Sequence, residues 1–274
     1  MDTFRLTKWY LDLVDDQGWS AIAYWARVNW GPLALGWEGL SLHLETGAAV
    51  HRSARAVGDE PAWSGETLAW RSAGLGVCLE CAPWCAPFES RLFESADGMV
   101  EWSCQAPGAT VTFDAGDGRT VRGTGYAERI VLTLAPWRLP ISELRWGRWC
   151  SARTRRSLVW IDWRGERPLT LVLDGGCPRE RAVVGDQAIA FADSPEAANL
   201  SVLRLDRPHT LYARTLSDVL RGLRPLAARL PAPWQAVEDR KTRSAGTLLA
   251  GEVEADTGWA IHEVVRLPGE RVSP

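Results

Sequence analysis

The segment 123–134, GTGYAERIVLTL, places one carboxylate among apolar side chains. If the segment is a strand, Tyr126, Glu128 and Ile130 share a face, because successive side chains of a strand point to opposite sides. A carboxylate in apolar surroundings loses hydration, which favours its protonated form, so Glu128 could hold a proton near neutral pH as a general acid must. The alternatives are a structural ion pair between Glu128 and an arginine, or an outward-facing side chain.

Tryptophan is the second unusual feature, since the chain has 16 Trp but only 5 Phe and 4 Tyr. Trp102 and Tyr24 each share a face of a predicted strand with apolar residues. Aromatic ring faces can line an apolar cavity and stabilise a passing cation, although most buried aromatics simply fill a core. The aromatic candidates for contact with a ligand are Trp102, Tyr24, Trp25 and Trp146.

Polar residues near the C-terminus form a third candidate. His262 and Glu263 are adjacent in the predicted strand 258–267, so one of the two points inward. An interior hydrogen bond is the default role, and a polar group in a ligand pocket is the alternative, for which we keep Glu263 as the candidate. Asp12 and Asp162 raise the same question on their own Trp-flanked strands.

Motifs of other enzyme classes are absent from the sequence. It contains no G-x-S-x-G elbow, no P-loop and no H-E-x-x-H motif. A metal site built on the cysteines of CLECAPWC would need a fourth ligand, and the four histidines show no paired spacing nearby. We therefore predict no metal and no cofactor, and we expect the six cysteines to be reduced core residues.

The charge pattern does not suggest a nucleic-acid partner. The net charge is −3, and no basic stripe interleaved with aromatics appears, so we expect no nucleic-acid partner.

No stretch approaches the roughly 18 apolar residues of a membrane helix. The opening MDTFRLTKWYLDL carries polar and acidic residues where a signal peptide would be apolar, so we expect a cytoplasmic chain. The oligomeric state is left open.

Short segments in which apolar and polar residues alternate recur every 8–15 residues along most of the chain. This alternation predicts β-strands, so the candidate side chains lie on strands. One helical pattern, near 216–230, interrupts them. Prolines at 136 and 140 indicate a passage between two β-units, 1–140 and 141–274. The predicted fold is mainly all-β, with two antiparallel barrel or sandwich domains. The predicted strands are 9–14, 20–30, 39–45, 66–71, 76–82, 99–104, 109–113, 123–134, one from about 144, 157–163, 169–174, 181–191, 200–205, 209–213, 246–254 and 258–267.

Several blocks carry a family resemblance: WYLDLVDDQG, VEWSCQAP, GTGYAERIVLTLAPWRLPISELRWGRW and the tail GWAIHEVVRLP. They resemble the superfamily of carotenoid 1,2-hydratases (hydroxyneurosporene synthases), AttH-like proteins and tocopherol cyclase-like proteins, mainly over the first 165 residues. The resemblance implies two lipocalin-like β domains, with an apolar ligand held at or near the surface where they meet.

The resemblance also implies roles for particular residues. The hydratases place their proton-donating acid in a Tyr-x-Asp arrangement, and Tyr126 and Glu128 stand in the matching places with Glu for Asp. The hydratases carry a His-x-Trp pair upstream, of which only Trp102 has a counterpart here. The missing His puts hydration in doubt and leaves acid-initiated cyclisation, isomerisation or ligand binding open.

The leading hypothesis is an enzyme, a hydratase-type lyase or an isomerase or cyclase, that acts on a hydrophobic polyene or isoprenoid-type small molecule. Glu128 would donate a proton, Tyr126 would orient it, and Trp102 with other tryptophans would stabilise positive charge. The alternative is a non-catalytic binding protein for apolar metabolites. A third hypothesis is an interaction module whose tryptophans only fill two barrels.

Overall fold

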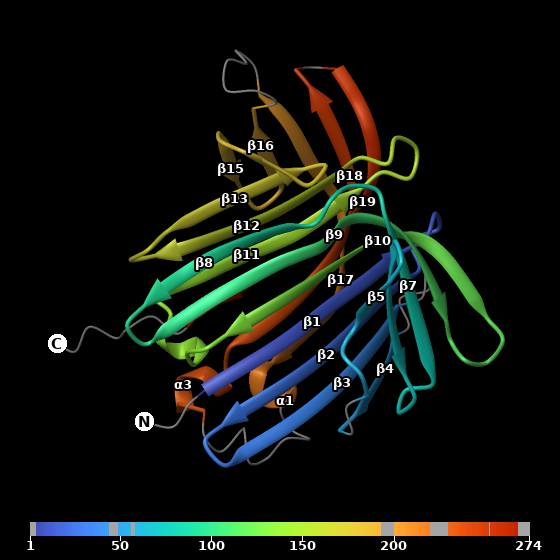
Figure 1. The fold of residues 1–274 in the computed structure, drawn as a ribbon. Coiled ribbons are helices and arrows are strands. Elements are labelled where there is room, and N and C mark those ends of the chain that lie inside the picture. The colour runs from blue at the N-terminus through green and yellow to red at the C-terminus, as the bar shows by residue number, and fades with distance from the viewer. Residues whose placement is uncertain are drawn as a thin grey trace. The chain divides into compact units, whose positions relative to one another are not determined.

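The structure is a computed structural model, and it describes residues 4–43, 49–55, 58–192, 200–219, 230–251 and 253–267. Nearly all regular structure in these ranges is β-strand, arranged in two antiparallel sheets (Figure 1). The predicted fold class, mainly all-β with two antiparallel β-units, is confirmed. No helix among the described residues is long and apolar enough to cross a membrane.

The first sheet has ten strands in the order β4-β3-β2-β1-β10-β9-β7-β6-β5, and β8 pairs with β9. β1 therefore pairs with the last strand of its sheet, more than a hundred residues away. The strands are β1 (Phe4–Val14), β2 (Ser20–Trp30), β3 (Leu33–His43), β4 (Ala49–Ala54), β5 (Ala62–Ser64), β6 (Thr67–Ser72), β7 (Val77–Pro83), β8 (Phe88–Ser95), β9 (Gly98–Asp114) and β10 (Thr120–Leu132).

The second sheet has nine strands in the order β14-β13-β12-β11-β19-β18-β17-β16-β15. Its first strand, β11, also pairs with its last strand, β19, so both sheets join their first strand to their last. The strands are β11 (Ile141–Cys150), β12 (Ser157–Gly165), β13 (Leu169–Asp174), β14 (Cys177–Arg179), β15 (Ala182–Val184), β16 (Ala188–Phe191), β17 (Ser201–Thr215), β18 (Glu238–Ala250) and β19 (Val253–Arg266).

Several predicted strands differ from the observed ones because of local irregularities. The predicted strands 99–104 and 109–113 form one strand, β9, and 200–205 with 209–213 form β17, which continues through a register shift at Arg207 and Pro208. The predicted strand 181–191 is instead the hairpin of β15 and β16. Bulges keep a strand continuous across residues that break its alternation, so the sequence pattern alone divides it.

Among the described residues, helix occurs only in short segments. They are a 3₁₀ turn at Pro136–Arg138, α1 at Leu216–Val219 and α3 at Ala232–Gln235. The predicted helical insert near 216–230 begins where α1 lies, and its residues 220–229 lie outside the described part of the chain.

Two compact units divide the chain. One comprises Met1–Pro136, Cys150–Leu158 and Leu173–Cys177, and the other comprises Trp137–Trp149, Val159–Val172 and Pro178–Pro274. The domain boundary at 140/141, in the sense of two separately folding domains, stays a prediction.

The hairpin between β1 and β2 shows how local chemistry sets the register. The Asp15 carboxylate accepts hydrogen bonds from the backbone N–H groups of Gln17 and Trp19, at 2.9 and 2.8 Å. Gly18 supplies the positive φ of 87° that the turn requires. The turn pairs Val14 with Ser20, and this register decides which side chains of the two strands share a face.

The first sheet has two distinct faces. One face carries the apolar cluster that includes Leu11, Leu13, Ala23 and Ala127. Side chains at alternate positions of the same strands point the other way, and they include the predicted acid Glu128. We call this opposite side of β3, β2, β1, β10 and β9 the tyrosine face.

Candidate functional site

Glu128 accepts two hydrogen bonds at one oxygen atom. The Trp102 indole N–H donates to Oε2 at 2.6 Å, and the Tyr126 hydroxyl donates to the same oxygen at 2.7 Å. Trp102 comes from β9, while Tyr126 and Glu128 are two residues apart on β10. The three residues that the sequence singled out for acid chemistry are therefore in direct contact.

A β-bulge in β9 decides which of its side chains join this cluster. The extra residues lie in β9, so Cys104 comes to lie opposite Glu128, while the register of β10 with β1 runs unbroken through Tyr126. The pairing of β10 with β9 shifts register between Gly125 and Ala127 and again before Glu128, and Tyr126 has no partner in that register. Bulges re-aim side chains and recur next to active sites. An alanine at Gly125 would put its Cβ 2.0 Å from the carbonyl oxygen of Asp12, so the close approach of β1 at this bulge requires glycine.

A second Tyr-x-acid pair lies on the neighbouring strand. The Tyr10 hydroxyl donates to Asp12 Oδ2 at 2.7 Å, as Tyr126 does to Glu128. The antiparallel register sets Tyr10 opposite Glu128 and Asp12 opposite Tyr126. Asp12 is fully buried. Sequence reasoning noted Asp12 without a role, although the repeated Tyr-x-acid spacing at 10–12 and 126–128 was a signal for this pairing.

An aromatic row crosses the tyrosine face from β10 to β3. Ring centroids are 6.1 Å apart for Tyr126 and Tyr10, 5.3 Å for Tyr10 and Tyr24, and 5.8 Å for Tyr24 and Trp37. The ammonium nitrogen of Lys8 lies 5.1 Å from the centre of the Tyr24 ring. The predicted residue Tyr24 thus joins the Glu128 cluster through Tyr10, and the row offers a series of π surfaces.

Burial keeps the donors of this cluster neutral. Loss of hydration, followed by the neighbouring Cys104 and Glu128, raises the pKa of Tyr126 well above its usual value. Burial also raises the pKa of the Cys104 thiol, which lies beside Tyr126. Tyr126 therefore keeps its proton at physiological pH and acts as a hydrogen-bond donor, not as a base.

Trp25 lies on the opposite face of β2 from Tyr24. It belongs to the apolar cluster, and its indole N–H donates to the carbonyl oxygen of Gly58 at 3.2 Å. The Gly58 N–H in turn donates to the buried carboxylate of Glu38 at 2.8 Å. The structure therefore does not bring Trp25 together with Tyr24 and Glu128, since adjacent strand residues point to opposite sides.

Trp146 and Glu263 meet in the second sheet through a buried lysine. Lys241 Nζ lies 2.5 Å from Glu263 Oε2 and 4.6 Å from the centre of the Trp146 ring. Lys241 is only 2% exposed. Burial acts to lower the pKa of Lys241, but Glu263, Tyr212 and Asp239 together outweigh it, so the pKa is raised. Lys241, Glu263 and Trp146 form an ion pair capped by an aromatic ring. Sequence reasoning missed Lys241 because alternation along one strand does not show which residue of β18 pairs with Glu263 on β19.

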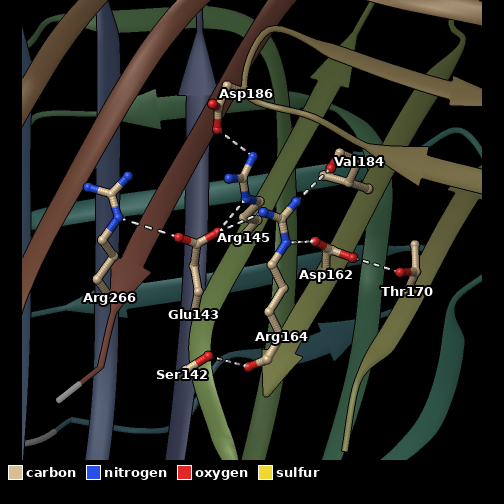
Figure 2. A network of polar contacts seen from close by, with 9 residues as sticks. All are labelled: Ser142, Glu143, Arg145, Asp162, Arg164, Thr170, Val184, Asp186 and Arg266. Atoms are coloured by element: carbon tan, nitrogen blue, oxygen red, sulfur yellow. Dashed lines mark hydrogen bonds and ion pairs between the residues drawn. The ribbon is translucent and has the colours of Figure 1, made fainter. Parts of the chain in front are cut away.

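A charged network covers another part of the second sheet (Figure 2). Glu143 Oε1 accepts from Arg145 at 2.7 Å and lies 3.2 Å from Arg164, which also bonds Asp162 at 2.9 Å. Arg145 further pairs with Asp186. Arg266 adds a third cation at 3.4 Å from Glu143. The three arginines of this network are matched by three carboxylates, so its charges are balanced. We interpret the network as stabilising the sheet and not as binding a ligand.

Comparison with solved structures defines the fold. A protein of Nitrosomonas europaea described as AttH superposes with a TM-score of 0.51 and 12% identity, over 95% of this chain and 92% of that one. CghA, crystallised with Sch210972, matches with a TM-score of 0.51 and 12% identity, over 97% and 89%. The chain has an AttH-like, lipocalin-like fold.

Other comparisons add little to this AttH-like assignment. Kievitone hydratase of Nectria haematococca matches with a TM-score of 0.49 and 10% identity, over 97% of this chain and 89% of that one. No family model matches the chain, and no curated protein sequence does. The family resemblance inferred from the sequence is confirmed at the level of the fold.

The two candidate clusters occupy equivalent places in the AttH-like fold. Glu128 and Glu263 both lie on the last strand of their sheet, where that strand pairs with the first one.

Within the described ranges, no group of three or more His, Cys, Asp or Glu side chains could hold a metal ion. An open pocket of about 280 Å³ lies elsewhere, lined by Arg71, Ser72, Ala73, Gly76, Val77, Cys78, Asp114 and Gly116, and contains none of the predicted site residues.

Proposed function

We propose that this chain is an enzyme that acts on a hydrophobic polyene or isoprenoid-type small molecule, with Glu128 as its acid. The observation that carries the proposal is the pair of donors, Trp102 and Tyr126, on one carboxylate oxygen of Glu128. CghA, an AttH-like structure crystallised with a small molecule, supports the use of this fold for such ligands.

The two donors would act on Glu128 most strongly after it has given up its proton. Transfer of a proton from Glu128 to an alkene carbon leaves a carbocation on the substrate and a carboxylate on Glu128. Hydrogen bonds to an ionised acceptor are about twice as strong as neutral ones, so both donors gain strength as the negative charge develops. Trp102 and Tyr126 would therefore stabilise the transition state more than the ground state.

The aromatic row would stabilise the carbocation that proton transfer leaves on the substrate. A carbocation is attracted to the negative faces of aromatic rings, and Tyr10, Tyr24 and Trp37 extend the row away from Glu128. Loss of a proton from a neighbouring carbon, returned to the Glu128 carboxylate, completes an isomerisation. Attack by a second double bond forms a ring and leaves a new cation, which loses a proton in the same way. Addition of water followed by loss of a proton from its oxygen completes a hydration.

Deuterium uptake tests the proposal. The purified chain is incubated in D₂O with all-trans-retinol, farnesol and β-carotene, and the recovered compounds are examined by mass spectrometry for changed structure and for deuterium on carbon. We expect turnover of at least one compound, with deuterium on carbon where the enzyme protonates it. Glu128→Gln should lower the rate by about 100- to 10,000-fold, the usual contribution of a general acid.

The matched control is Glu101→Gln, which removes the carboxylate next to Trp102 in sequence. Glu101 is 43% exposed and lies 3.6 Å from Arg91, so this change should leave turnover intact. Full activity of Glu128→Gln would refute the acid assignment. Quenching of tryptophan emission by the compounds, with no product from the wild type, would favour the binding-protein alternative.

A further inference from the structure

Two buried hydroxyl groups stand out on the tyrosine face. Ser20 is fully buried and Thr124 is 7% exposed. Among the described residues, neither Ser20 Oγ nor Thr124 Oγ1 has a hydrogen-bond partner. Both residues lie opposite Val14, Ser20 on β2 and Thr124 on β10. We call these two groups the hydroxyl pair.

The register places the hydroxyl pair on the same face as the acid. Val14 lies two residues from Asp12 along β1, so their side chains point the same way. Thr124 precedes Tyr126 by two residues and Glu128 by four on β10. At about 3.3 Å per residue, the Thr124 hydroxyl lies roughly 13 Å from Glu128 along the strand. Of the aromatic row, Tyr126 lies between them along β10, while Tyr10 and Tyr24 lie level with Glu128 on β1 and β2.

Two neighbouring hydroxyls on this face, those of Thr110 and Ser41, have hydrogen-bond partners. Thr110, directly opposite Thr124 on β9, accepts a hydrogen bond from the Trp84 indole N–H at 3.0 Å. Ser41, on β3, is bonded to His51 Nδ1 at 2.8 Å. Buried hydroxyls nearly always have a partner, because burying one without a hydrogen bond costs free energy. Position on the face therefore does not explain the unpaired state of Ser20 and Thr124.

We propose that the hydroxyl pair binds oxygen atoms of the ligand, so that the ligand is an oxygenated apolar molecule and not a pure hydrocarbon. The inference rests on the proposed function, since it extends the same site away from Glu128. Because β2 and β10 flank β1 at about 4.8 Å each, roughly 10 Å separates the two hydroxyls, and each takes a different oxygen. An alcohol or carbonyl group about 13 Å from the reacting carbon would reach Thr124.

The two possible roles of these hydroxyls predict opposite changes in stability and binding. Thr124→Val and Ser20→Ala remove a hydroxyl and keep most of the side-chain volume. Removing an unsatisfied buried hydroxyl should leave the melting temperature equal or higher. Loss of a hydrogen bond to the ligand should weaken binding of an oxygenated compound by about three- to tenfold.

The probes are all-trans-retinol and its deoxy hydrocarbon, titrated into the wild-type protein and each variant while tryptophan emission is recorded. We expect the wild type to bind the alcohol more tightly. At least one of Thr124→Val and Ser20→Ala should bring the alcohol to the affinity of the hydrocarbon without lowering the melting temperature. The control Thr110→Val should lower the melting temperature, because it leaves the Trp84 N–H without its acceptor.

Each outcome separates this inference from the proposed function. Equal binding of the two probes by the wild type overturns the inference and leaves the acid chemistry of Glu128 standing. Binding of neither probe overturns the inference and counts against the apolar ligand as well. A lower melting temperature in both hydroxyl variants, with the preference for alcohol unchanged, shows that the hydroxyls are structural and overturns the inference.

Discussion

His262 should couple the stability of the second sheet to pH. Its Nε2 lies 2.9 Å from Ser244 Oγ, within the interior of the β18–β19 pair. Burial, together with the nearby Lys241 ammonium group, lowers the pKa of His262 to about 4, while Glu263 acts in the other direction. The folded state therefore prefers the neutral imidazole, and the unfolded chain takes up a proton first as the pH falls.

The size of the effect follows from the two pKa values. The unfolded value is about 6.5 and the folded value about 4, so between these values the unfolded state binds more protons and stability decreases as the pH falls. With about 1.4 kcal/mol per pKa unit, the contribution is near zero at pH 8 and reaches a loss of about 2 kcal/mol at pH 5 and about 3 kcal/mol at pH 4.

The perturbation is His262→Gln, which keeps a polar partner for Ser244 but does not titrate. Urea denaturation of wild type and variant at pH 8, 6, 5 and 4 gives the difference in unfolding free energy at each pH. At pH 8 this difference reports packing alone, and on acidification it should change by about 3 kcal/mol in favour of the variant. An NMR titration of the wild-type imidazole gives the midpoint directly. A difference that stays flat from pH 8 to pH 4, or an NMR midpoint near 6.5, would refute the reasoning.

Two further changes test the packing of the second sheet. Lys241→Met leaves the Glu263 carboxylate buried without its cation and should cost about 3–5 kcal/mol of unfolding free energy, much of which the double variant with Glu263→Gln should recover. A loss below about 1 kcal/mol in denaturant titration would contradict the buried ion pair. Gly147→Ala would put a Cβ 2.2 Å from Trp160 Cζ2 and 2.7 Å from His262 Cβ, so it should cost about 1–3 kcal/mol. An unchanged thermal midpoint for this variant would show that the neighbouring strands can move apart.

Alternation along a strand is a local property, and for this reason the sequence could predict which residues of one strand act together. Tyr126 with Glu128, and the separation of His262 from Glu263, follow from the two-residue period alone. The mainly all-β class follows in the same way, from short periodic segments without long helical patterns. The repeated Tyr-x-acid spacing of Tyr10 and Asp12 was also present in the sequence.

The sequence did not predict which distant strands pair, because pairing depends on strand order and register, and no local pattern contains these. Only the tertiary structure joins β1 to β10 and so brings Asp12 beside Tyr126, and only the bulge in β9 near Gly125 brings Cys104 and Trp102 to the face of Glu128. It also separates Trp25 from Tyr24 by deciding which face of β2 carries the apolar cluster.

The same limit applies to partners and unmet hydrogen bonds. The sequence contains only two lysines, yet nothing in it shows that Lys241 pairs with Glu263 over Trp146. Nor could it show that Thr110 is satisfied and Thr124 is not, since the two differ only in what faces them. The sequence by itself determined which side chains each strand presents, and the long-range packing decided which of them meet.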